Sequence, residues 1–225
     1  MKPYIICHMY TLLDGRIDCA VTEKMDGTTE YYDTLDELNV PTVLSGKVTA
    51  AMHYAAPGVF EAKNTSAFGR EAFKKAVESE AYSVVVDTKG TLLWHSNKVD
   101  GNPLICVLSE QTTQEYLNYL DEKGISWIVA GKEKIDLARA VEILAEQFNV
   151  KRLGIVGGGH INGSFLDAGL LDEISIVLGA GIDGRAGMAA AFDGLPQDRE
   201  PFKMKLTDVK QYDCSAVWLR YKVIK

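Results

Sequence analysis

The chain has 225 residues, of which 47% are hydrophobic and 24% are charged, and this balance is typical of a globular protein with a substantial core. Its 24 basic and 31 acidic residues give a net charge of −7, which disfavours nucleic-acid binding. No stretch approaches the roughly 18 consecutive apolar residues of a transmembrane span, so we expect no membrane binding. The four cysteines lie far apart and form no CxxC pair, which predicts reduced thiols, no metal site and a cytoplasmic location.

Short segments rich in Ile, Val and Leu recur along the chain and predict strands that are buried on both faces of a sheet. These segments are residues 4–9, 42–45, 83–87, 104–109, 126–130, 152–156 and 173–178. Helical periodicity appears between them. Thr112 and Glu115 predict a capping box for a helix that ends at Gly124, and Asp136 is expected to cap another. This alternation indicates an α/β protein with a largely parallel sheet and helices on both faces.

The last part of the chain departs from this alternation. Residues 203–213 and 215–224 predict two strands that are joined tightly, so they should form an antiparallel hairpin at one edge of a mixed sheet. The turn-rich segments 14–31, 55–69 and 179–201 fall between predicted elements rather than in an interdomain linker. We therefore expect residues 1–225 to form a single domain whose long loops serve as lids or binding loops.

The most informative segment is 152–185, RLGIVGGGHINGSFLDAGLLDEISIVLGAGIDGR, where a predicted strand leads into a glycine triplet and then a helix. Glycines let a ligand approach the backbone, and the first turn of a helix offers N–H groups and the positive end of the helix dipole. This context favours a phosphate site, while the alternative is a simple strand-to-helix turn. The spacing lacks the GxGxxG pattern of Rossmann dehydrogenases. The candidate cofactor-binding residues here are Gly157, Gly158, Gly159, His160, Ile161 and Asn162.

Two further turns are candidates for anion binding. In the SGKVT sequence, Gly46 permits close approach to the backbone, Lys47 supplies a positive charge and Thr49 offers a hydroxyl near a helix start. In the DTKG sequence, Thr88 and Lys89 are suited to an extra phosphate such as the 2′-phosphate of NADP. An ordinary helix start and an ordinary turn explain the same residue types, so both alternatives stay open at this point.

The first predicted strand is followed by Asp14 and Gly15, which on their own are a common turn signal. His8 lies inside that strand and is more typical of a hydrogen-bonded core histidine than of a catalyst. No pattern matches a Ser-His-Asp relay or an HExxH metal site. Residue types alone therefore do not identify the proton donor of any reaction.

Taken in chain order, the blocks DGRI, SGKVT, VVVDTKGTL and IVGGGHINGSFLDAGLLDEISI resemble the reductase domain of bacterial riboflavin biosynthesis, across nearly the whole chain. The resemblance implies the three-layer dihydrofolate-reductase-like fold and NADPH as cofactor, with its pyrophosphate between the Gly46 turn and the glycine triplet. It also implies a homodimer that acts on a small molecule. The reaction would carry a hydride from the nicotinamide to the ribose C1′ of a ribosylaminopyrimidine phosphate, with Asp14 near the substrate as the candidate catalytic residue.

The chain departs from that family at one position. Riboflavin-pathway reductases typically carry Glu-Gly-Gly where this chain has Gly157, Gly158 and Gly159, and the carboxylate helps to engage the pyrimidine. Three alternatives therefore stay beside the pyrimidine reductase: a dihydrofolate-reductase-like enzyme with an unrelated substrate, a non-catalytic nucleotide-binding module and a flavin-binding protein. Thr88 and Lys89 are the sequence's one indication of a preference for NADPH over NADH.

Overall fold

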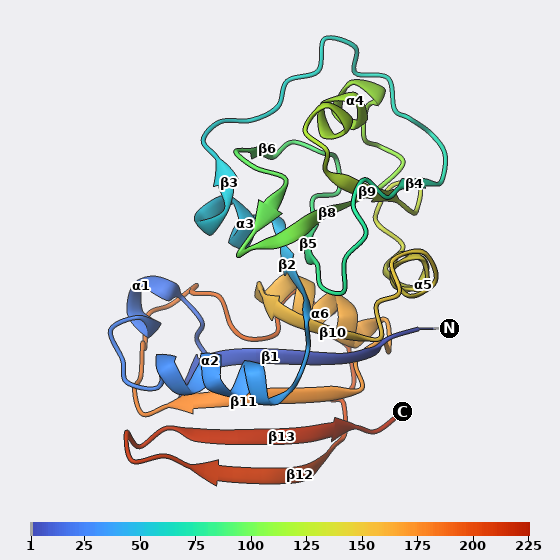
Figure 1. Cartoon of the computed structure of the whole chain (residues 1–225). Helices are drawn as coiled ribbons and strands as arrows, with labels where there is room; N and C mark the ends of the chain where they lie inside the picture. Colours follow the sequence, from blue (N-terminus) through green and yellow to red (C-terminus); the bar gives the residue numbers. More distant parts are fainter. Residues whose placement is uncertain (1) are drawn as a thin grey trace. The chain divides into compact units, whose positions relative to one another are not determined.

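The computed structural model describes residues 2–225, which form two compact units (Figure 1). The first unit contains residues 2–3 and Pro41–Leu153, and the second contains Tyr4–Val40 and Gly154–Lys225. Among these residues no helix has both the length and the apolar character needed to cross a membrane. The single domain expected from the sequence stays a prediction.

The first unit is built on a parallel sheet with the strand order β2-β5-β8-β9 and with β4 antiparallel to β9 at the edge. The short strand β7 pairs with the start of β8, and β3 pairs with β6 in a separate two-stranded sheet. The bounds are β2 (Thr42–Gly46), β3 (Ala55–Ala56), β4 (Ala72–Lys74), β5 (Ser83–Val86), β6 (Leu93–Trp94), β7 (Lys98–Val99), β8 (Asn102–Leu108) and β9 (Ser126–Val129).

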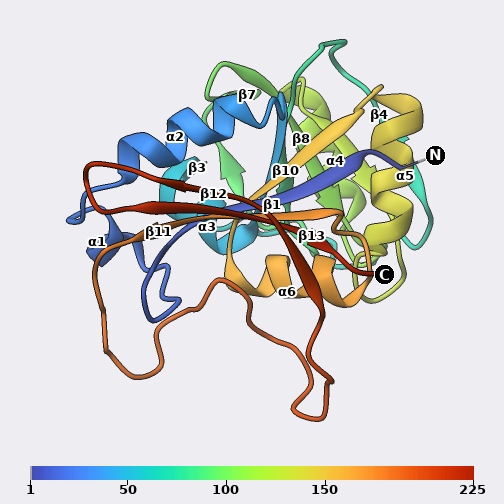
Figure 2. The same cartoon turned by 90° about the horizontal axis from the view of Figure 1, so that it is seen from below.

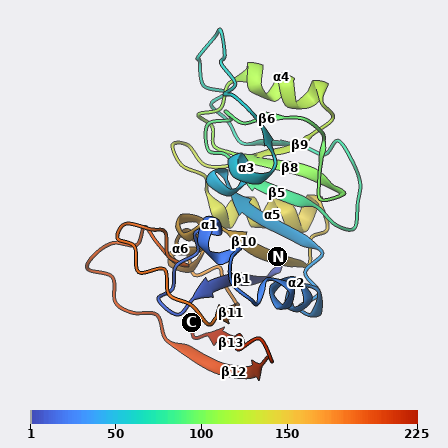
Figure 3. The ribbon, with the colours of Figure 1, turned by 90° about the vertical axis from the view of Figure 1, so that its left-hand side faces the viewer.

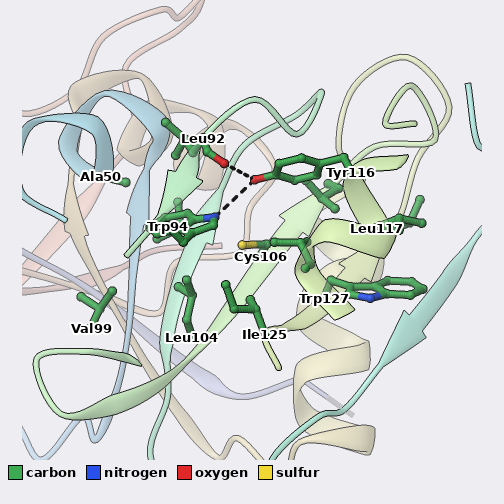
Figure 4. Packing of buried hydrophobic residues seen from close by; sticks show 14 residues of the cluster. Ala50, Leu92, Trp94, Val99, Leu104, Cys106, Tyr116, Leu117, Ile125 and Trp127 are labelled. Carbon is green, nitrogen blue, oxygen red and sulfur yellow. Dashed lines mark hydrogen bonds between the residues drawn. The ribbon is translucent and has the colours of Figure 1, made fainter. Parts of the chain in front are cut away.

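The helices of this unit are α3 (Lys47–His53), α4 (Gln114–Glu122) and α5 (Leu137–Gln147). Helices α4 and α5 lie on opposite sides of β8 and β9 (Figures 1 and 3). Val85, Cys106 and Trp127 are adjacent in register across β5, β8 and β9, and they belong to one buried cluster with Tyr116 and Leu117 of α4 (Figure 4). The neighbouring residues along these strands are buried as well, which explains the nearly continuous apolar segments of the sequence.

The start of α4 differs from the predicted capping box. Thr113, not Thr112, is the N-cap, and its hydroxyl accepts a hydrogen bond from the Tyr116 amide. The Glu115 carboxylate does not return to the cap, because it accepts the amides of Lys63 and Asn64 in the preceding loop. The predicted cap was therefore wrong by one residue, and the predicted glutamate binds a segment distant in sequence instead of the cap.

The second unit has the strand order β12-β13-β11-β1-β10. Strands β1 and β11 are parallel, whereas β13 is antiparallel to both β11 and β12, so the predicted C-terminal hairpin is confirmed (Figure 3). The bounds are β1 (Tyr4–Leu12), β10 (Arg152–Gly157, of which residues 154–157 belong to this unit), β11 (Glu173–Gly179), β12 (Met204–Gln211) and β13 (Val217–Val223).

Three helices belong to the second unit: α1 (Cys19–Thr22), α2 (Thr28–Glu37) and α6 (Gly159–Asp167). Helices α2 and α6 lie on opposite faces of the strands (Figures 1 and 2). A mixed, mostly parallel sheet with helices on both faces is thus confirmed. The sequence did not predict α1 or α2, since they begin in the turn-rich segment 14–31 and α2 has a polar average composition with only Thr34 fully buried.

Candidate functional site

The first candidate turn of the first unit joins β2 directly to α3. Gly46 is the last residue of β2, Lys47 opens the helix and the Thr49 side chain is half-buried. The Lys47 ammonium does not stand alone, because its Nζ lies 3.4 Å from Oδ1 of Asp87 and donates a hydrogen bond to the Thr91 hydroxyl. The predicted positive charge is therefore already paired inside the unit.

The second candidate turn, residues 87–91, is organised around the buried side chain of Asp87. Oδ2 of Asp87 accepts the amides of Thr91 at 2.5 Å and Leu92 at 2.8 Å, while the backbone carbonyl of Asp87 accepts the Gly90 amide at 2.9 Å. Gly90 has a φ of 72°, and a Cβ at this position would lie 2.2 Å from the Tyr116 ring. Only glycine fits there, so the turn depends on this residue.

Thr88 and Lys89 occupy the outer part of this turn. The Thr88 carbonyl accepts hydrogen bonds from the Ser109 amide at 2.9 Å and the Ser109 hydroxyl at 2.8 Å, which fixes the backbone beside Lys89. Lys89 is exposed, and it forms no ion pair within the described part of the chain. A rigid turn that presents an uncompensated ammonium to solvent suits a phosphate group.

In the second unit, the glycine triplet forms the predicted strand-to-helix turn. Gly157 ends β10, Gly158 is the N-cap of α6 with a φ of 92°, and Gly159 opens the helix. The first amides of a helix have no intrahelical acceptor, so this start offers donors to an anion. A Cβ on Gly159 would lie 2.2 Å from the carbonyl oxygen of Ala190, so this glycine also allows close packing of the loop after β11.

The residues that follow the triplet differ in exposure: some face solvent and one contacts the loop after β11. His160 is exposed and Ile161 is partly buried, whereas Asn162 is fully buried. The Asn162 amide group donates to the Ala191 carbonyl at 2.7 Å, and its Oδ1 has no hydrogen-bond partner among residues 2–225. Asn162 therefore helps to hold the loop, a contact that the sequence did not predict.

Asp14 lies at the exposed turn after β1 and contacts the same loop. Its Oδ2 accepts the Gly184 amide at 2.8 Å, and this hydrogen bond lowers the pKa of the carboxyl group below its usual value. The adjoining backbone is also hydrogen-bonded to this loop. The Leu13 amide donates to the Gly181 carbonyl, and the Ala191 amide donates to the Gly15 carbonyl. Asp14 is consequently an ionised hydrogen-bond acceptor near neutral pH, which does not suit it as a proton donor.

An ion-pair cluster reinforces this loop. Arg185 bonds to Asp183 and Asp18, with the shortest guanidinium-to-carboxylate distance to each at 2.5 Å, and the Asp183 side chain is almost completely buried. Hydrogen bonding to Arg185 lowers the pKa of Asp183. Arg16 donates to the Met188 carbonyl at 2.7 Å. The loop is thus held in place on the turn that carries Asp14.

The predicted core role of His8 agrees with the structure. Its side chain is fully buried, and its ring stacks on Tyr31 with 4.6 Å between centroids. Both ring nitrogens have partners, since Nδ1 lies 2.9 Å from the Ser175 hydroxyl and Nε2 lies 3.0 Å from the Tyr31 carbonyl. No group of three or more His, Cys, Asp or Glu side chains among residues 2–225 is arranged to hold a metal ion.

The structure thus links candidate residues that the sequence treated separately. Lys47 joins the Thr88 and Lys89 turn through Asp87 and Thr91, and Asp14 joins the loop after β11. Sequence reasoning did not assign a role to Asp87, although an acidic residue directly after a buried apolar strand was a usable signal. It also missed the side chain of Asp193, which packs beside Gly159 and accepts the Ala190 amide.

Comparison with known families decides which fold this arrangement represents. A family model described as the RibD C-terminal domain matches residues 3–218. The chain belongs to the RibD C-terminal domain family. It is similar to the 2,5-diamino-6-ribosylamino-4(3H)-pyrimidinone 5′-phosphate reductase of Methanothermobacter thermautotrophicus, with 26% identity over 206 residues that cover 86% of this chain and 85% of the relative. The resemblance inferred from the sequence blocks is therefore confirmed.

Solved structures show the same fold. A pyrimidine reductase-like protein from Corynebacterium diphtheriae matches with a TM-score of 0.73 and 15% identity, over 99% of this chain and 92% of that one. The riboflavin biosynthesis reductase of Saccharomyces cerevisiae matches with a TM-score of 0.65 and 18% identity, over 99% and 90%. RibD of Acinetobacter baumannii matches with a TM-score of 0.68 and 20% identity, and this chain covers 58% of it.

Proposed function

We propose that this RibD C-terminal domain protein is a reductase that uses NADPH to reduce a ribosylaminopyrimidine phosphate of the kind used in riboflavin biosynthesis. The observation that carries the proposal is the family match over residues 3–218, supported by the relative named as a pyrimidinone phosphate reductase. An exposed lysine on a hydrogen-bonded turn and a helix start with backbone donors support this chemistry, because a reductase must hold an anionic cofactor in one orientation.

The cofactor proposal assigns a separate task to each turn. Exposed Lys89, with Thr88 beside it, would bind the 2′-phosphate that distinguishes NADPH from NADH. The backbone of Gly157 and Gly158 and the first amides of α6 would bind phosphate oxygens. The bound nicotinamide supplies the hydride. The chain's own residues bind the cofactor and orient it against the electrophilic carbon.

The substrate proposal concerns Asp14. Because the Gly184 amide keeps its pKa low, the carboxylate is suited to accept a hydrogen bond from a substrate hydroxyl or N–H group. Gly157, which stands where the family carries a glutamate, favours a second candidate, a dihydrofolate-reductase-like enzyme with a different heterocyclic substrate. We also propose that the protein is a homodimer and that it is cytoplasmic. The four free cysteines support the second point, because they suit a reducing location.

The deciding experiment mixes purified protein, NADPH and the ribosylaminopyrimidine phosphate and follows the loss of nicotinamide absorbance. We expect turnover with NADPH and a higher KM with NADH. Lys89→Met should raise the KM for NADPH about 10-fold and leave that for NADH nearly unchanged, whereas Lys98→Met removes an equal charge at the opposite end of the parallel strands and should change neither. Cofactor binding without oxidation would favour the non-catalytic module, and the absence of binding would refute the proposal.

A further inference from the structure

The strongest unassigned feature is the contact between Lys47 and Asp87. We propose that Lys47 is a positioning residue: by pairing with the buried carboxylate of Asp87, it clamps the turn at Gly46 to the turn at residues 87–91. In this role Lys47 does not itself bind a phosphate. The inference rests on the proposed function only where it concerns cofactor binding.

The sheet brings the two turns together before any side chain is considered. Strands β2 and β5 are parallel and adjacent, with Gly46 opposite Val86, so the residues that follow each strand emerge side by side. Lys47 and Asp87 are those next residues. Their side-chain groups lie 3.4 Å apart, with the lysine side chain 49% exposed and the aspartate side chain 1% exposed. The charged group of a flexible surface residue is therefore held against a buried carboxylate.

The turn supplies the other hydrogen bonds that the Asp87 carboxylate accepts. Oδ2 accepts two backbone amides, from Thr91 and Leu92, and Oδ1 faces Lys47 and, at 3.4 Å, the Thr91 hydroxyl. Removing the cation that is paired with a buried carboxylate is costly. A phosphate that drew the Lys47 ammonium away would leave the buried Asp87 carboxylate without its cation. The ion pair therefore favours an ammonium that stays beside Asp87.

Side chains of the core also contact this turn from its buried side, so the Lys47 contact adds to an already supported segment. The Tyr116 hydroxyl donates to the Leu92 carbonyl at 2.8 Å and accepts the Trp94 indole N–H at 3.3 Å (Figure 4). The Tyr116 ring also lies directly below Gly90. Lys47 adds the connection to β2 and α3 that these contacts from α4 do not make.

Asp87→Asn separates the two possible roles of Lys47. The asparagine Oδ1 can replace Oδ2 and keep both backbone hydrogen bonds, so this variant removes the ion pair and keeps the turn. If Lys47 is a clamp, Asp87→Asn weakens cofactor binding. If Lys47 is a phosphate ligand that Asp87 merely neutralises, the same variant frees the ammonium and tightens binding.

The experiment is a double-mutant cycle with Lys47→Met, Asp87→Asn and the double variant, titrated with NADPH and with NADH by fluorescence. We expect each single variant to raise both Kd values about 3- to 10-fold, and the double variant to be no weaker than the weaker single variant. Lys98→Met, which removes a lysine of β7 that pairs with the start of β8, is the control and should bind like wild type. Tighter binding by Asp87→Asn, or additive losses in the double variant, would overturn the clamp.

Thermal melting of the same four proteins tests the clamp without any cofactor. Lys47→Met should lower Tm by about 2–4 °C in the wild-type background and by much less in the Asp87→Asn background. Wild-type protein that binds neither nucleotide refutes the proposed function, and the clamp is then judged by melting alone. Equal Tm losses in both backgrounds would refute the clamp while leaving the proposed function intact.

Discussion

Acidification from pH 8 to pH 5 should lower the free energy of unfolding through the single residue His8. Its Nε2 faces the Tyr31 carbonyl, which only accepts hydrogen bonds, so Nε2 carries the proton of the neutral ring. Nδ1 is then an acceptor for the Ser175 hydroxyl, whose oxygen in turn accepts the Trp218 indole N–H at 2.7 Å. This network is complete with a neutral ring, and burial disfavours the charged form.

The size of the effect follows from the two pKa values. Burial lowers the pKa of His8 from 6.5 to about 4 in the folded protein, whereas the unfolded chain keeps the ordinary value. As the pH falls below 6.5 the unfolded state takes up the proton first, so the stabilisation present above pH 6.5 is lost between pH 6.5 and pH 4. At pH 5 the loss amounts to about 2 kcal/mol, since each pKa unit corresponds to about 1.4 kcal/mol.

Urea unfolding of wild type and His8→Gln at both pH values isolates this contribution, because all other titrating groups are shared. The difference in unfolding free energy between the two proteins should shrink by about 2 kcal/mol on acidification. A direct check is the NMR titration of the four histidine rings, one of which should titrate near pH 4. The reasoning fails if the difference is the same at both pH values or if all four rings titrate above pH 6.

Three further outcomes follow from the contacts. Gly163→Ala should lower Tm despite the better helix propensity of alanine, because its Cβ would lie 2.2 Å from the Asp193 carbonyl oxygen; a thermal melt checks the sign. Thr112→Val should raise the unfolding free energy by about 1 kcal/mol in urea titrations, since the buried Thr112 hydroxyl has no partner among residues 2–225. Asp14→Asn keeps an acceptor for the Gly184 amide, so Tm should hold while kcat/KM falls, and wild-type activity should show no ionisation of Asp14 between pH 5 and 8.

The elements that could be predicted from the sequence are those with a local signal. The parallel strands were found because both of their faces are buried, and the C-terminal hairpin because two strands follow each other closely. Helix α2 was missed because it lacks such a signal. Its polar composition gives little periodicity, and its position depends on packing against β1. At α4 the sequence also could not show that Glu115 binds the loop at Lys63 and Asn64, a non-local contact that replaces the predicted capping box.

In the candidate site, too, local signals were predictable from the sequence and non-local contacts were not. Turn signals placed Lys89 in a turn and Lys47 at a helix start, as the structure has them, but their different surroundings come from the sheet. The register that sets Gly46 beside Val86 places Lys47 next to a buried aspartate 40 positions away, while Lys89 stays exposed. Two lysines that look equivalent in sequence are therefore expected to differ in function: one pairs within the protein and the other is available to a ligand.

The glycines of the GGGHING segment carry a similar lesson. Gly158 has the positive φ of a turn, as expected for a strand that leads into a helix. Gly159 and Gly163 are four residues apart on one face of α6, and a Cβ on either would collide with the loop that contains Ala190 and Asp193. Spacing of four is typical of a helix face that another segment contacts closely, whereas a phosphate site needs glycine only at the turn itself. The spacing within the motif thus separates the glycines that pack a loop from those that can meet a ligand.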